Sequence, residues 1–98
     1  MFKVLILPES KEDIREAARW YNKQQKGLGK QFTIEIRDKV KFIRQNPKAS
    51  NIRYDKVRTA VLKRFPFMIH YTINERNQTI IITAVLHTSL NPDIWKSR

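Results

Sequence analysis

Three strand-like segments in the second half of the chain constrain its fold most strongly. They span about Val57–Lys63, Phe67–Ile73 and Thr79–Leu86, and they are rich in branched and aromatic residues. Phe65-Pro66 separates the first segment from the second, and the run from Asn74 to Asn77 has the composition of a turn. Connections this short join antiparallel neighbours, so the sequence predicts a three-stranded antiparallel meander.

The first half of the chain predicts one strand and two helices. The segment Phe2–Leu7 is apolar almost throughout, which favours a strand inside the sheet, buried on both sides. A helix should follow, with Ser10 as its N-cap and Asp13 completing a capping box, and it should stop at Gly27. A second helix is expected from about residue 28 to residue 45. The short connection predicts an antiparallel helical hairpin.

The resulting order of elements is β-α-α-β-β-β, which belongs to the α+β class. Residues 48–56 are polar and are expected to form a connecting loop. A chain of 98 residues is the size of one domain, so we expect a single domain over residues 1–98. The helical hairpin should cover one face of a mostly antiparallel sheet. The other face would then stay partly open and could bind a partner.

Charge and composition narrow the classes of partner. The chain has 20 Lys and Arg against 9 Asp and Glu, a net charge of +11 that favours a polyanion or an acidic protein. It has no cysteine, no glycine-rich phosphate loop and no metal-ligand spacing around its two histidines, so neither metal nor cofactor is expected. The apolar start is too short for a signal peptide or a membrane span. A cytoplasmic protein with no membrane partner is expected.

Four stretches of the chain follow one another as they do in one known family. Trp20–Gly29 is similar to a family hairpin motif, Y-Y-x-x-Q-x-x-G-L-G, and Phe32–Pro47 is similar to its second helix with a terminal N-P. Leu62–Tyr71 resembles L-x-R-F-P-Y-x-I-x-Y. Ala84–His87 with Pro92–Trp95 resembles the closing A-V-x-H and P-x-x-W. Together these motifs resemble the RelE/ParE superfamily of bacterial toxins, which includes the plasmid stabilization proteins.

This resemblance implies a toxin of a type II toxin–antitoxin module that inhibits growth and is neutralised by a cognate antitoxin in a hetero-oligomer. RelE-like members cleave mRNA on the ribosome, whereas ParE-like members inhibit DNA gyrase. The positions where RelE-like enzymes carry catalytic cations fall here at Ala60, Leu62, Met68 and Thr88, none of which is basic. The V-L-H at Val85–His87 is similar to ParE-like members. The resemblance therefore favours a ParE-like toxin that is not an enzyme.

Two alternatives remain open at this stage. A ribosome-dependent ribonuclease could use His87 as a general base, with Arg58, Lys63 and Arg64 as the cations that stabilise a charged transition state. The plainer interpretation of His87 is a structural histidine bonded to backbone at the sheet edge. The other alternative is a non-toxic domain that binds bare RNA or DNA. His70 alternates with the core residues of its strand and should face away from them.

Basic and aromatic residues give the candidate contact surface. The basic stripe of Arg37, Lys41 and Arg44 fits a solvated helix face equally well. Trp95 could instead dock the C-terminal segment onto the sheet. The family often has Arg where this chain has Leu90, so a weak or inactive toxin is implied if that Arg touches the target. The residues expected to bind a partner or nucleic acid are Arg37, Lys41, Arg44, Arg58, Lys63, Arg64, His87 and Trp95.

Overall fold

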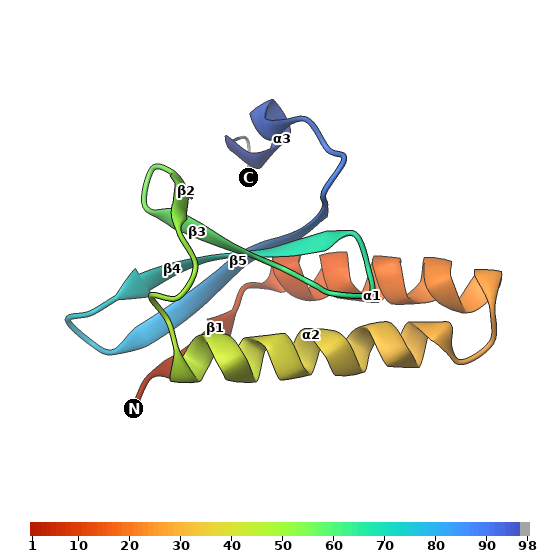
Figure 1. The fold of residues 1–98 in the computed structure, drawn as a ribbon, viewed down its shortest axis with the longest axis horizontal. Helices are drawn as coiled ribbons and strands as arrows, with labels where there is room; N and C mark the ends of the chain where they lie inside the picture. Colours follow the sequence, from red (N-terminus) through yellow and green to blue (C-terminus); the bar gives the residue numbers. More distant parts are fainter. Residues whose placement is uncertain (97–98) are drawn as a thin grey trace.

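The computed structural model describes residues 1–96 as a five-stranded sheet with two long helices on one face and a short helix on the other (Figure 1). The α+β class and the order of the six expected elements are confirmed. Two short elements, β2 and α3, were not expected. The elements are β1 (Lys3–Ile6), α1 (Pro8–Gln24), α2 (Leu28–Gln45), β2 (Ile52–Tyr54), β3 (Val57–Val61), β4 (Phe67–Asn74), β5 (Thr79–His87) and α3 (Pro92–Lys96).

The sheet has the order β1-β5-β4-β3-β2. Strands β3, β4 and β5 form the predicted antiparallel meander, and β1 pairs in parallel with β5. The prediction that the first strand lies inside the sheet is wrong, because β1 is an edge strand. Val4 and Ile6 pack against the main core, whereas Leu5 on the opposite side is 52% exposed. Only the face of β1 that points toward the helices is covered, and the burial of Val4 and Ile6 on that face holds the edge strand in place.

The start of α1 differs from the predicted capping box. The helix begins at Pro8, a residue favoured in the first turn, and Ser10 is fully buried inside it. The Ser10 Oγ donates to the Ile82 carbonyl at 3.0 Å, and the Asp13 carboxylate accepts from the Val85 N–H at 3.0 Å. The Ile82 carbonyl also accepts the Leu7 N–H at 3.2 Å. Because β1 pairs with β5 only as far as Ile82, the Asp13 carboxylate satisfies a backbone donor, the Val85 N–H, that β1 does not reach.

The main core lies between the sheet and the helical hairpin. Aromatic rings from both layers meet in it, with Phe32 and Phe65 edge-to-face at 5.2 Å and Tyr21 and Phe65 at 4.8 Å. The helices approach closely at Gly29. A Cβ there would collide with the Ala18 carbonyl oxygen and would lie 3.1 Å from the Asn22 Cβ. The fully buried residues of this core include Phe32, Ile43, Ile69, Tyr71, Ile80, Ile82 and Val85.

A smaller core covers part of the other face of the sheet. Helix α3 lies above this face in Figure 1, and its Trp95 packs with Met68, Ala84 and Leu86. Leu90 is partly buried against the same cluster. The second face is therefore partly open, as expected, but α3 closes the half nearest the end of β5.

Candidate functional site

The four candidate catalytic residues lie toward two ends of the sheet, with Lys63, Arg64 and His87 near the start of β4 and Arg58 away from them. Arg58 is near the start of β3, where its Nη1 donates to the Ser50 carbonyl at 2.6 Å and fastens the loop before β2. Lys63 and Arg64 are in the turn beyond the other end of β3. Four residues lie between Arg58 and Lys63, and the five steps of extended chain that join them span roughly 16 Å. Arg58 and Lys63 are therefore kept apart by their positions near opposite ends of β3.

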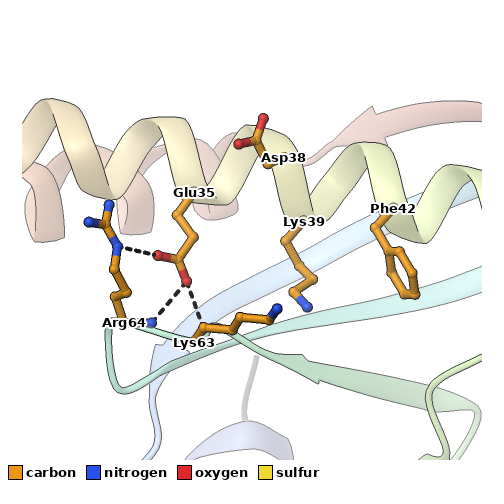
Figure 2. Close-up of a pocket in the computed structure, with 6 residues that line it drawn as sticks. All are labelled: Glu35, Asp38, Lys39, Phe42, Lys63 and Arg64. Atoms are coloured by element: carbon orange, nitrogen blue, oxygen red, sulfur yellow. Dashed lines mark hydrogen bonds and ion pairs between the residues drawn. The ribbon is translucent and has the colours of Figure 1, made fainter.

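Glu35 on α2 organises the turn that holds Lys63 and Arg64. Its carboxylate accepts the Lys63 N–H at 2.6 Å and the Arg64 N–H at 3.1 Å, and the Arg64 Nε lies 3.3 Å from its second oxygen (Figure 2). Burial alone would raise the pKa of Glu35. The hydrogen bonds from Arg64 and Lys63 outweigh it, so the pKa is lowered from its ordinary value of 4.5. Nothing in the sequence distinguishes Glu35 from the other Asp and Glu residues, of which the chain has nine in all.

Helix α2 and the turn enclose a groove of about 570 Å³. Figure 2 shows Lys39 and Phe42 following Glu35 along the helix, with Lys63 and Arg64 across from them. The ring of Phe42 is exposed, and so is the side chain of Val61 on β3. The groove itself therefore places the Phe42 ring beside three cations and two carboxylates, Glu35 and Asp38.

Glu35→Gln is expected to lower the free energy of unfolding by about 1–2 kcal/mol near pH 7, because charge-assisted bonds to the turn are lost. A lowered pKa in the folded state gives stability that is present above pH 4.5 and disappears as the pH falls through the folded value. The difference in unfolding free energy between the wild type and the variant should therefore be smaller at an acidic pH well below 4.5 than at pH 7. Urea unfolding at both pH values measures this, with Asp38→Asn from the same groove as the control. A difference in unfolding free energy between the wild type and Glu35→Gln that is equal at both pH values would contradict the role of the Glu35 carboxylate.

His87 ends β5 and uses its ring locally. Its Nδ1 accepts the Ser89 N–H at 3.1 Å and lies 2.7 Å from the Ser89 hydroxyl, while the ring packs edge-to-face on Phe67 at 5.2 Å. These contacts match the interpretation of His87 as a structural histidine bonded to backbone. The side chain borders a hollow of about 370 Å³ whose wall includes the exposed Trp20.

The second histidine and Trp95 belong to the smaller core. His70 faces away from the main core, as predicted, and is fully buried, with its Nδ1 3.0 Å from the Tyr54 hydroxyl. The Trp95 ring stands edge-on to His70 at 5.1 Å, and Arg53 lies over Trp95 at 5.4 Å. Trp95 is only 7% exposed. It therefore docks the C-terminal segment onto the sheet and does not form part of an open contact surface.

The predicted stripe on α2 lies on the outside of the helix. Arg37, Lys41 and Arg44 are all exposed. Arg44 is also fixed to the start of the chain, since its Nε donates to the Phe2 carbonyl at 2.9 Å and its Nη2 lies 2.9 Å from the Met1 sulfur. The stripe thus reaches the edge of the sheet at β1.

Neither a metal-binding cluster nor a membrane-spanning helix occurs within residues 1–96. No group of three His, Asp or Glu side chains there is placed to hold a metal ion. Of the helices in the same range, none is long and apolar enough to cross a membrane.

Comparison with known proteins gives one family and several structures. The family model described as ParE toxin of type II toxin–antitoxin system, parDE, matches residues 4–92. No curated protein sequence matches the chain. A chain of the chromosomal ParDE system from P. aeruginosa superposes with a TM-score of 0.80 at 19% identity, covering 91% of this chain and 98% of that one.

Other solved structures share the fold at lower identity. A chain of the intact E. coli RelBE toxin–antitoxin complex has a TM-score of 0.69 at 11% identity, covering 93% of this chain and 100% of that one. A chain of the RelBE2 complex from Mycobacterium tuberculosis has a TM-score of 0.61 at 12% identity, covering 88% and 96%. At these identities the structural likeness supports the fold alone.

Proposed function

Because the chain belongs to the ParE toxin family of type II toxin–antitoxin systems, we propose that it inhibits DNA gyrase by binding it and that a cognate antitoxin neutralises it. In this proposal the protein inhibits gyrase by binding alone and does not cleave RNA. The observation that supports this proposal is that Arg58 lies at the other end of β3 from the Lys63–Arg64 turn, while Arg64 and His87 are bonded to Glu35 and Ser89.

Cleavage of RNA by its own 2′-hydroxyl needs a base and cations that converge on one phosphate. Here Arg58 lies at the opposite end of β3 from Lys63, and Arg64 is paired with Glu35. The His87 Nδ1 is used by Ser89. A static surface that binds a protein target needs no such convergence, which favours gyrase inhibition over catalysis.

The surface also suits an antitoxin segment that is acidic and partly apolar. Exposed apolar side chains, among them Trp20, Phe42 and Val61, lie on a molecule whose net charge is +11. A segment that folds on binding must offset the free-energy cost of its own ordering. Contacts that combine buried apolar area with charge complementarity can supply that free energy.

Induced expression in E. coli, with and without the short reading frame that neighbours the gene, tests the toxin and antitoxin parts of the proposal. Growth arrest that this second frame relieves is expected, and harmless expression alone would overturn the assignment. With purified gyrase and relaxed plasmid, the protein is expected to inhibit supercoiling. Codon-positioned cuts found by primer extension on a translated mRNA would instead establish a RelE-like nuclease.

A further inference from the structure

Three hollows at one end of the molecule join into a continuous depression, which we name the basic groove. The first, of about 410 Å³, lies between the C-terminal end of α2 and the start of the chain. It shares Phe2 and Pro47 with a second hollow of about 490 Å³. The second shares Lys48 and Glu75 with a third hollow of about 160 Å³ beside β2 and β3. The depression thus runs from α2 across the end of the sheet.

Cations line the basic groove along its whole length, with a single carboxylate, Glu75, in its wall. The acid lies 2.7 Å from the Lys48 Nζ, and both side chains are exposed. The pKa of Glu75 is lowered by its hydrogen bond from Lys48, by the charge of Lys48 and by the charge of Arg58. The cations are Lys41, Arg44, Lys48, Lys56 and Arg58.

Backbone contacts fix the shape of the basic groove. Arg44 donates to the Phe2 carbonyl at 2.9 Å, and Arg58 donates to the Ser50 carbonyl at 2.6 Å. The Tyr71 hydroxyl donates to the Pro47 carbonyl at 2.7 Å and holds the loop between them. Two guanidinium groups are therefore positioned before any ligand arrives, which lowers the entropic cost of binding.

We propose that the basic groove binds single-stranded nucleic acid, with phosphates along the row of cations and Glu75 occupying one phosphate position in the free protein. A row of like charges fits a polymer that carries one charge at each repeat. Apolar residues occur in each hollow, among them Phe2, Pro47 and Ile52. A single strand can place its bases against such residues, whereas a duplex keeps its bases covered. This inference does not depend on gyrase being the target.

Fluorescence anisotropy with the full chain and a labelled oligonucleotide of about 20 nucleotides tests the proposal, using oligo-dT and oligo-U to compare DNA with RNA. The test variant is Lys41→Gln with Lys56→Gln. The control is Lys26→Gln with Lys30→Gln, which removes the same charge near the hairpin turn, at the opposite end of the molecule from β2 (Figure 1). All four lysines are exposed.

The groove variant is expected to bind about tenfold more weakly, and the control less than about threefold more weakly. The slope of log affinity against log salt should fall by about 1.4 for the groove variant, because each lost phosphate contact contributes about 0.7 on single strands. Glu75→Gln should bind more tightly than the wild type, since it removes the competing carboxylate.

Three results would overturn the proposal. Equal losses in the two double variants would show that binding follows net charge only. A duplex that binds as tightly as the single strand would remove the role of the apolar residues. Competition by poly-glutamate at the same concentration of charge would assign the basic groove to an acidic protein instead. Circular dichroism of each variant confirms that the fold is retained.

Discussion

Gly29→Ala is expected to lower the free energy of unfolding by about 3 kcal/mol, a large share of the stability of a domain of this size. The new Cβ would meet the Ala18 carbonyl oxygen, a backbone atom that no side-chain rotation can move aside. To accommodate it, α1 and α2 must separate where Asn22 also lies 3.1 Å away. Separation would loosen the contact that closes the main core.

Gly27→Ala is the matched comparison, because it makes the same chemical change two residues earlier. No heavy atom lies within 4 Å of a Cβ at Gly27, so there is no collision. Its φ of +89° still disfavours a side chain, at a cost of roughly 1–2 kcal/mol. Urea unfolding followed at 222 nm should therefore rank Gly29→Ala as the more destabilised. The reverse order would disprove the close approach of the two helices.

Trp95→Ala is expected to cost about 3–5 kcal/mol, as large-to-small changes of buried aromatics do. The ring is 7% exposed and contacts Tyr54, His70 and Arg53, so its loss removes the main attachment of α3. Undocking of α3 would expose Met68 and Leu86, which pack beneath it.

Ile94→Ala controls for changes within α3 itself, because Ile94 is 43% exposed and should cost less than about 1 kcal/mol. Urea unfolding gives the stability of each variant, and near-ultraviolet circular dichroism reports the environment of the aromatic rings. Equal stability of the two variants would show that α3 is not held by Trp95.

The meander was predictable because its signals are local. The Phe65-Pro66 interruption and the polar run after Asn74 fix the connections, and the apolar strands between them are long enough to recognise. Strand β2 has three residues and α3 has five, which is too short for either periodicity to appear. Short elements of this kind depend on tertiary contacts, such as Trp95 against Tyr54.

The errors at the start of the chain have one origin. Ser10 and Asp13 fit a capping box by spacing, yet both bond to β5, which is 72 residues away in the sequence. The position of β1 was predicted wrongly for a related reason, because an apolar run does not say which face will be covered. Long-range partners of this kind leave no local mark.

The candidate site was predictable as a set of charges but not as an arrangement. Arg58, Lys63 and Arg64 were identified by their basic character, whereas their partners are the Ser50 carbonyl and Glu35. A backbone oxygen and an acid on a distant helix cannot be selected from one sequence. His87 was identified with both of its possible roles, and its contact with Ser89 supports the structural one.

The attachment of α1 to the end of β5 also bears on how copies of this protein behave when crowded. An exposed strand border invites a neighbouring molecule to extend the ladder, which is a route to aggregation. Here the Ser10 hydroxyl and the Asp13 carboxylate occupy rungs of β5 at Ile82 and Val85, just where β1 ends. Replacing Asp13 would leave the Val85 N–H open at that border, whereas the Ile82 carbonyl would keep its bond from the Leu7 N–H.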